Sequence, residues 1–369
     1  MAKATETVLE IDLNALVHNY RYLRSRIRPE TKFMAVVKAY GYGSDAQEIA
    51  MCLQKAQVDY FAVAYVNEGI ALRKAGITIP ILVLHPQKVH FKTLIEHNLE
   101  PSIYSHAILE QFIRTAQELG KLAYPIHLKF NTGLNRLGFT YADLPKIYTA
   151  TEAQHAIKVK AILSHLAATE DRNETEFTQL QLNRFEAICN KAETLFGYKL
   201  IKHVLNTSGI INYPNAQLDM VRSGIGLYGY GNDATIDADL IPVVTLKTII
   251  AQKHTIPAGE SVGYNRKYVS KKPTVTATLP LGHADGIGRQ YGQGNTFVRI
   301  NGQLAPIVGN VCMDMIMVDV TEIECEEGDE VIIFGKKLPA TEFSGTADTI
   351  SYELLTGISQ RIPRVIYKN

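Results

Sequence analysis

The stretch Phe33-Met34-Ala35-Val36-Val37-Lys38-Ala39-Tyr40-Gly41-Tyr42-Gly43 joins a short apolar run to a lysine, two tyrosines and two glycines. The run ends in β-branched residues and glycine follows it, so it predicts a buried strand over 33–38. A lone ammonium group at the end of a buried strand is costly unless it is paired or used. Lysine condenses with carbonyl compounds, and desolvation lowers its pKa. Lys38 is therefore a candidate Schiff-base lysine; a lysine that reaches solvent from a strand end is the alternative.

The alternation of short apolar runs with helical patterns continues to about residue 230. Asp12 precedes apolar residues spaced three or four apart, which predicts a capped helix. Candidate strands lie at 33–38, 60–65, 79–84, 101–104, 126–130, 159–164, 201–206 and 219–223, and helical patterns lie between them. Eight strands with helices between neighbours predict an α/β fold in which 12–238 form an N-terminal (β/α)8 TIM barrel. An open doubly wound sheet is the structural alternative.

The pattern changes near residue 235. Residues 274–279 alternate with a period of two, and glycine and proline recur at short intervals. These features predict a C-terminal, mostly β domain over 239–369. The strand-like N-terminal segment 1–11 is expected to join its sheet. Two domains also agree with a length of 369 residues, which is large for a single core.

Composition argues against several classes of partner. The net charge is +1, so a nucleic-acid partner is not expected. The four cysteines are scattered and form neither a disulfide framework nor a zinc motif. The predicted strands contain no HxH pair, which argues against a metal-dependent barrel hydrolase. The N-terminus lacks an apolar signal core, and no stretch is long enough for a membrane span. We expect a cytoplasmic protein without metal.

Polar residues recur where the predicted strands end, and the active site of a barrel gathers at these ends. They are Lys38, Lys129, His165, Asn206 with Thr207, and Arg222. Gly224-Ile225-Gly226 follows the last of them, and successive N–H groups in such a turn can bind a phosphate. A phosphate site facing a candidate Schiff-base lysine suggests pyridoxal phosphate.

These segments resemble the alanine racemases, the barrel-type (fold-type III) pyridoxal-phosphate enzymes, over essentially the whole chain. The matching segments are 33–43, 129–138, Ser164-His165, Asn206-Thr207, 222–229, Ser261-Val262-Gly263-Tyr264, Val311-Cys312-Met313-Asp314, Ser351-Tyr352-Glu353 and Arg361-Ile362-Pro363-Arg364. The resemblance implies the interconversion of L- and D-alanine by two bases, which supplies D-alanine for peptidoglycan. Racemisation of another small amino acid, such as serine, is the alternative.

The resemblance also implies roles for individual residues. Lys38 would hold the cofactor and act as one base, and Tyr264 would be the other. Arg222 would donate a hydrogen bond to the pyridine nitrogen, with His165 beside the ring. The remaining cofactor contacts would come from Tyr42, Asn206, Thr207, Gly224, Ile225 and Tyr352. Arg136, Met313 and Asp314 would bind substrate, and Lys129 would be carbamylated beside Arg136. In this family the β domain covers the barrel of the other subunit, which implies a homodimer with shared active sites.

Some positions depart from the family pattern. Tyr40-Gly41 replaces a usual Asn-Ala, and Asn131 replaces a common Asp. His283 replaces the tyrosine that lines the substrate's path to the site. Since histidine changes charge near neutral pH, this path and its pH dependence are expected to differ. A barrel decarboxylase would pair the pyridine nitrogen with a carboxylate, so Arg222 argues against it. A non-catalytic pyridoxal-phosphate carrier would lack the β domain.

Overall fold

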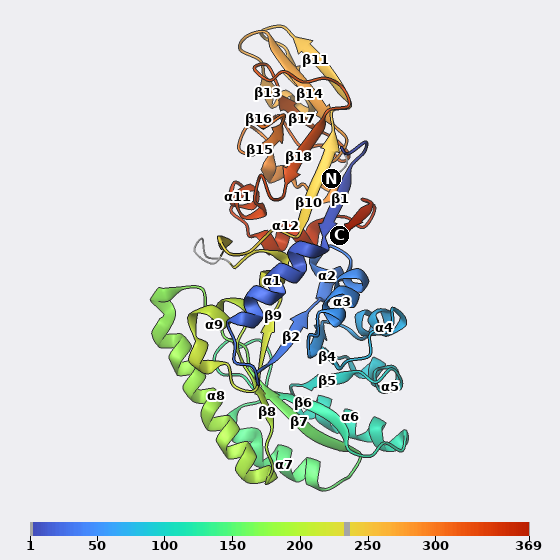
Figure 1. The fold of residues 1–369 in the computed structure, drawn as a ribbon, viewed down its shortest axis with the longest axis vertical. Coiled ribbons are helices and arrows are strands. Elements are labelled where there is room, and N and C mark those ends of the chain that lie inside the picture. The colour runs from blue at the N-terminus through green and yellow to red at the C-terminus, as the bar shows by residue number, and fades with distance from the viewer. Residues whose placement is uncertain (1–2, 232–236, 369) are drawn as a thin grey trace.

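The computed structural model describes residues 3–231 and 237–368. Figure 1 shows two regions along the long axis of the molecule, with the barrel below and the β domain above it. Strand β1 (Val8–Asp12) belongs to the upper region, and helix α1 (Leu13–Ser25) leads from it into the barrel. Asp12 caps α1, because its carboxylate accepts hydrogen bonds from the backbone N–H groups of Asn14 and Ala15.

Eight parallel strands close into a barrel. They are β2 (Lys32–Val36), β3 (Tyr60–Val63), β4 (Ile81–Val83), β5 (Glu100–Ile103), β6 (Tyr124–Lys129), β7 (Ile157–Leu163), β8 (Ile201–His203) and β9 (Met220–Ser223). The helices that connect them are α2 (Lys38–Tyr42), α3 (Ala46–Lys55), α4 (Val66–Lys74), α5 (Phe91–Glu96), α6 (His106–Glu118), α7 (Leu144–Glu152), α8 (Thr175–Phe196) and α9 (Thr207–Asn212).

The predicted TIM barrel is confirmed, and the pairing of β2 with β9 excludes an open doubly wound sheet. Individual strand ends differ from the prediction. Strand β2 ends at Val36, two residues before Lys38, and β8 ends at His203 rather than at 206. Arg222 lies inside β9 and not after it. Apolar runs predict where strands lie, but the last ladder hydrogen bond depends on the neighbouring strand.

The β domain is built on a nine-stranded sheet in the order β11-β14-β17-β16-β15-β18-β10-β1-β19. These strands are β10 (Val244–Ile249), β11 (Gln252–Ile256), β14 (Thr274–Leu279), β15 (Phe297–Ile300), β16 (Gln303–Val308), β17 (Ile316–Asp319), β18 (Glu330–Phe334) and β19 (Arg364–Tyr367), with β1. Strands β12 (Ser261–Val262) and β13 (Tyr268–Val269) form a separate hairpin. The predicted mostly β domain is confirmed. The prediction that an N-terminal strand joins its sheet is also confirmed, since β1 pairs antiparallel with β10 and parallel with β19.

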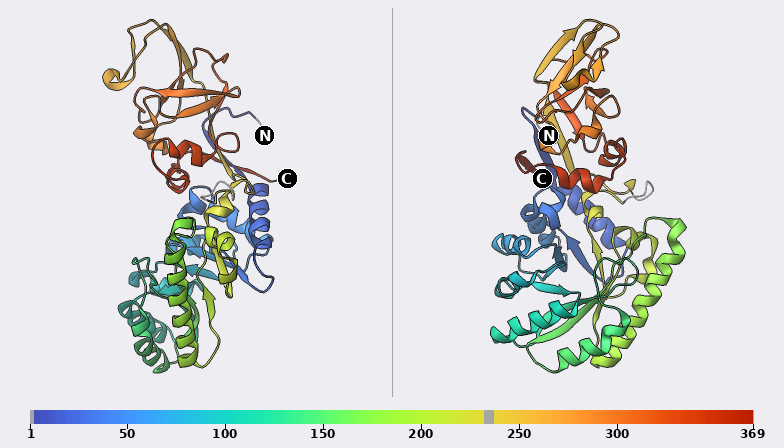
Figure 2. Two further views of the ribbon diagram at one scale, coloured as in Figure 1. Left: turned by 90° about the vertical axis from the view of Figure 1, so that its left-hand side faces the viewer. Right: turned by 180° about the vertical axis from the view of Figure 1, so that it is seen from behind.

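Two short helices, α11 (Ala340–Gly345) and α12 (Ser351–Gly357), lie on the side of the β domain that faces the barrel (Figures 1 and 2). Arg364 ties the two regions together by donating to the carbonyl oxygens of Gly43 and Ser44, at 2.8 and 3.3 Å. A Cβ atom on Gly43 would lie 2.0 Å from the carbonyl oxygen of Leu355 in α12, so only glycine permits this approach. Helix α12 thereby brings Tyr352 to the barrel mouth.

Across the described ranges, no helix is both long enough and apolar enough to cross a membrane.

Candidate active site

Lys38 begins a left-handed turn at the end of the first barrel strand. The five residues 39–43 all have positive φ angles, between 53° and 78°. Non-glycine residues adopt this conformation at a cost of about 1 kcal/mol each. Glu68 holds the start of the turn, because its carboxylate accepts from the N–H groups of Ala39 and Ala64, at 2.6 and 2.7 Å. No pattern in the sequence predicted this role of Glu68.

The barrel mouth carries a cluster of cationic side chains. Burial lowers the pKa of Lys38, and nearby Arg136 lowers it further, while Glu68 opposes the shift. Burial lowers the pKa of Lys129 to about 8, with added repulsion from Arg136, Arg222 and Lys38. The pKa of His165 lies well below its usual value because of burial and the same cationic neighbours. The cluster thus favours the binding of an anionic ligand, and it favours the neutral form of its own lysine amines.

Arg222 is buried inside the barrel, and no carboxylate of the described residues is among its hydrogen-bond partners. It donates to the Ser164, His203 and Val204 carbonyl oxygens at 2.7, 3.0 and 3.0 Å. It also contacts Nδ1 of His203 at 2.8 Å and Nδ1 of His165 at 3.3 Å. Burial lowers its pKa to about 10, so the guanidinium stays charged at neutral pH. Among the described residues, the hydrogen bonds of Arg222 use both Nη atoms and none uses Nε.

A small polar cradle lies beside Arg222. A Cβ atom on Gly224 would sit 2.1 Å from the Tyr42 hydroxyl oxygen, so the backbone and the phenol approach closely only because residue 224 is glycine. The Thr207 hydroxyl accepts from the Gly226 N–H at 3.3 Å. The rings of Tyr42 and Tyr352 lie 6.0 Å apart. The structure therefore brings together the predicted phosphate-binding groups from four separate segments.

The cradle and the cationic cluster meet an open cavity of about 820 Å³. Arg136, His165, Asn206 and Tyr352 line it, together with Ser351. The hydroxyls of Ser351 and Tyr228 are buried, and neither has a hydrogen-bond partner among the described residues. The Tyr228 ring stacks on that of Tyr42. Buried polar atoms are rarely left without a partner, so a ligand with hydrogen-bonding groups fits this site.

The side chains of Asn206 and Asn131 accept hydrogen bonds from backbone N–H groups a few residues farther along the chain. Asn206 caps α9, and its Oδ1 atom accepts from the Gly209 N–H and the Thr169 hydroxyl at 3.0 and 2.7 Å. Asn131 Oδ1 accepts from the N–H groups of Gly133 and Asn135 at 3.1 and 3.0 Å. Asn131 thus fits the turn that carries Arg136, and it places a neutral amide where the common Asp of the family would carry a negative charge.

The predicted site residues of the β domain lie apart from this cavity. Tyr264 is 70% exposed and Met313 is 60% exposed. His283 is also exposed, and its N–H donates to the Cys312 carbonyl oxygen at 2.9 Å. Asp314 pairs with Arg361 at 2.6 Å. Within the part of the chain that the structure describes, none of these four predicted residues lines the cavity that Arg136 and His165 line.

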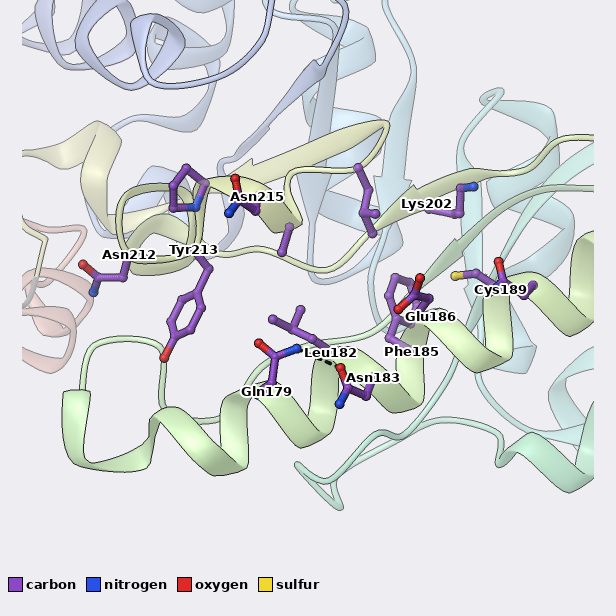
Figure 3. Close-up of a pocket in the computed structure, with 14 residues that line it drawn as sticks. Gln179, Leu182, Asn183, Phe185, Glu186, Cys189, Lys202, Asn212, Tyr213 and Asn215 are labelled. Carbon is purple, nitrogen blue, oxygen red and sulfur yellow. Dashed lines mark hydrogen bonds between the residues drawn. The ribbon is translucent and has the colours of Figure 1, made fainter.

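A separate pocket of about 440 Å³ lies outside the barrel, between α8 and residues 212–218. Figure 3 shows amide side chains such as Gln179 and Asn183 at its edge, with Cys189 farther along α8. Burial raises the pKa of Cys189 to about 12, so its thiol is unreactive at neutral pH. None of the predicted site residues lines this pocket.

The barrel, its buried lysine and its cationic mouth define a barrel enzyme with an anion-binding site. Residues 11–232 match the family model of the alanine racemase N-terminal domain, and residues 243–366 match that of the C-terminal domain. The chain therefore belongs to the alanine racemase family.

Individual relatives cover nearly the whole chain. Alanine racemase 2 of Caldanaerobacter subterraneus subsp. tengcongensis is 37% identical over 372 residues, which is 98% of this chain and 95% of the relative. The solved alanine racemase of Clostridium difficile 630 has a TM-score of 0.93 and 32% identity, and covers 100% of this chain and 97% of its own. The alanine racemase of Bartonella henselae, solved with covalently bound pyridoxal phosphate, has a TM-score of 0.90 and 30% identity, and covers 99% of this chain and 100% of its own. The resemblance predicted from sequence is thus confirmed.

Lys129 makes a testable contribution to stability. A lysine with a pKa near 8 in the folded chain and about 10.4 in the unfolded chain destabilises the fold below pH 8. This penalty shrinks as the pH rises from 8 toward 10.4, because the folded-state amine is then already neutral. In cofactor-free protein and CO₂-free buffer, Lys129→Met is expected to raise the free energy of unfolding by about 2 kcal/mol at pH 7. Urea unfolding measures the difference, which should shrink by pH 10; an equal difference at both pH values would contradict the assignment.

Proposed function

We propose that the chain is a cytoplasmic alanine racemase that interconverts L- and D-alanine with pyridoxal phosphate bound to Lys38, and so supplies D-alanine for peptidoglycan. The observation that carries the proposal is the position of Lys38, which stands in a cationic barrel mouth with a lowered pKa. A lysine with a lowered pKa has a larger fraction of neutral amine to form a Schiff base.

The residues present fit this cofactor. The hydroxyls of Tyr42, Thr207 and Tyr352 and the N–H groups of Gly224 and Ile225 would bind the phosphate, with Asn206 holding the loop. The close approach of Gly224 to Tyr42 supports this assignment. His165 would lie beside the ring, since it contacts Arg222 at 3.3 Å. Pyridoxal phosphate, when bound, supplies a conjugated ring that stabilises negative charge on the substrate's α-carbon.

Arg222 would face the pyridine nitrogen. An arginine only donates hydrogen bonds, and its pKa of about 10 keeps it charged at neutral pH. It would therefore leave that nitrogen without a proton and limit how strongly the ring withdraws electrons. This restraint favours return of a proton to the α-carbon over side reactions such as transamination.

Two bases on opposite faces of the substrate would move the proton. Lys38 would act on one face, and Tyr264 of a second subunit would act on the other. Tyr264 is one of several exposed large apolar side chains of the β domain, with Val269, Met313 and Met315. Exposed apolar side chains that gather on one surface favour a protein interface. We therefore propose a homodimer in which the β domain of each subunit closes the barrel of the other.

The substrate would lie between charged groups of both subunits. Arg136 would bind the substrate carboxylate from the barrel side, with the backbone of Met313 and with Asp314 on the other side. His283 would line the path to the site, because its backbone is bonded to the loop that carries Met313. Nothing in this arrangement favours serine over alanine.

Lys129 is expected to be carbamylated. Its pKa of about 8 gives a substantial fraction of neutral amine near pH 8, which can attack CO₂. The product is an anion among Arg136, Arg222 and Lys38, where the amine would be a fourth cation. Electron density from crystals grown with bicarbonate should show the added carboxylate. An unmodified amine under these conditions would contradict the expectation.

A direct assay tests the proposed function. The purified protein is given pyridoxal phosphate, its visible absorption is recorded, and D-alanine is measured after L-alanine is added. A visible band with D-alanine formation is expected. A band without D-alanine would overturn the assignment of alanine and lead to tests of serine, whereas the absence of a band would overturn the role of Lys38.

A further inference from the structure

Four buried polar side chains cross the interior of the barrel. Glu100 is the first residue of β5, His127 lies in β6, His203 ends β8 and Arg222 lies in β9. Each is at most 6% exposed. The interior of a (β/α)8 barrel is usually filled by branched apolar residues. The proposed reaction uses Arg222, but it gives no role to Glu100, His127 or His203.

Three hydrogen bonds join these side chains in one line. Glu100 Oε2 lies 2.7 Å from His127 Nε2. His127 Nδ1 lies 3.3 Å from His203 Nε2. His203 Nδ1 lies 2.8 Å from Arg222 Nη1. The line starts at the N-terminal end of β5 and finishes beside the barrel mouth.

The two end residues, Arg222 and Glu100, determine which atom donates in each of the three hydrogen bonds. Arginine only donates, so His203 Nδ1 must accept and the His203 proton must sit on Nε2. That proton is donated to His127 Nδ1, which places the His127 proton on Nε2. A carboxylate only accepts, so Glu100 completes the line. With these two ends, both histidines are neutral and carry their protons on Nε2.

The charge state of Glu100 supports this order. Burial by itself would raise the Glu100 pKa, but hydrogen bonds from His127 and Lys160 outweigh it and lower the pKa. Lys160 Nζ lies 2.7 Å from the second carboxylate oxygen. Glu100 is therefore an ionised acceptor near neutral pH. At the other end, burial and Arg222 keep the pKa of His203 well below its usual value, so its ring is neutral.

We propose that Glu100 is a positioning residue for Arg222. Without an acceptor at Glu100, the His127 N–H would be buried and unpaired, which favours moving both protons to the opposite nitrogens. The His203 proton would then point at Arg222, which would lose its contact with His203 Nδ1 and keep its backbone contacts and the contact with His165 Nδ1. Glu100 prevents this exchange and so holds Arg222 in the orientation that the bound cofactor meets. The proposal deepens the proposed function, because it assumes that Arg222 contacts pyridoxal phosphate.

Neutron diffraction from crystals of the full-length, perdeuterated protein tests the protonation order directly. A deuteron is expected on Nε2 of both His127 and His203, and none on either Nδ1. A deuteron on Nδ1 of either ring would overturn the proposal. This measurement needs no variant and holds whether or not the protein binds pyridoxal phosphate.

Variants test the effect on cofactor binding. Apoprotein is titrated with pyridoxal phosphate, and thermal stability is measured in parallel. Glu100→Leu should weaken binding by about tenfold, because it removes the acceptor. Glu100→Gln keeps a carbonyl oxygen for His127 and should bind within about twofold of wild type. Ser102→Ala is the matched control, since Ser102 is buried on the same face of β5 and its hydroxyl has no hydrogen-bond partner in residues 3–231 and 237–368.

The outcomes are distinct. If Glu100→Leu binds pyridoxal phosphate as tightly as wild type, or if Glu100→Gln loses as much affinity as Glu100→Leu, the positioning role is overturned. Lower stability without a change in affinity would show that Glu100 is only structural. If Glu100→Leu does not fold, the neutron result still decides the proposal. Failure of the wild-type apoprotein to bind pyridoxal phosphate would instead overturn the proposed function.

Discussion

Replacing Lys38 with alanine is expected to lower kcat/KM for alanine racemisation by at least about a thousandfold, because one substitution removes both the covalent attachment of the cofactor and one base. The visible absorption band of the cofactor-loaded protein should disappear as well. Lys38 is suited to both roles, since burial and Arg136 lower its pKa and leave more of its amine neutral.

Absorption spectroscopy and a D-alanine assay on the same preparations check this expectation. Lys55→Ala is a suitable control, because Lys55 is an exposed residue at the end of α3. The control should keep both the band and the activity. A Lys38→Ala protein with an unchanged band would show that the cofactor is attached elsewhere.

The second large effect is expected for Tyr264→Phe. Removing the phenol should lower kcat by about a hundredfold to ten-thousandfold, the range for loss of a general acid–base group. The visible band should remain, since Tyr264 does not hold the cofactor. Because the two bases serve opposite faces, exchange of the α-proton with solvent should fall much more for one enantiomer than for the other.

Mass spectrometry of α-deuterated L- and D-alanine during turnover measures this asymmetry. Tyr268→Phe, in the same hairpin, is the matched control and should behave as wild type. If Tyr264→Phe slowed exchange equally for both enantiomers, or left both unchanged, the assignment of two bases would be wrong.

The barrel could be predicted from sequence because each strand is a short apolar run between polar turns. Phe33, Phe61 and Ile126, for example, are completely buried, as the runs around them predict. Parallel strands buried on both faces leave this signal without any need for long-range information. The strand ends were less predictable, because they depend on the register with neighbouring strands.

The detailed geometry of the site could not be predicted in the same way. Ala39, Tyr40 and Tyr42 are ordinary residues in left-handed conformations, and sequence gives no sign of this at non-glycine positions. Glu68, which holds that turn, belongs to the next β/α unit. His203 was missed because a polar residue inside a short apolar run looks like a break in a pattern. A buried polar residue within a predicted strand is the signal that could have found it. Glu100 was missed because it lies one residue before the predicted strand 101–104, whereas β5 begins at Glu100.

The β-domain residues Tyr264, Met313 and Asp314 were proposed through the family resemblance alone. Among the residues that the structure describes, these three do not line the cavity at the barrel mouth of their own chain. Their exposure is what an incomplete half of a shared site would show. The spacing of apolar residues reflects packing within one chain, so it does not reveal a residue that acts in a second subunit.

The measurement that tests the central proposal most directly combines two inactive variants. Lys38→Ala and Tyr264→Phe subunits are co-expressed with different affinity tags, and the heterodimer is purified. If each site combines Lys38 of one subunit with Tyr264 of the other, the heterodimer contains one site with both wild-type residues. Its D-alanine formation should then reach about half of the wild-type rate. A heterodimer as inactive as its two parents, or a failure of the subunits to associate, would contradict the shared active site.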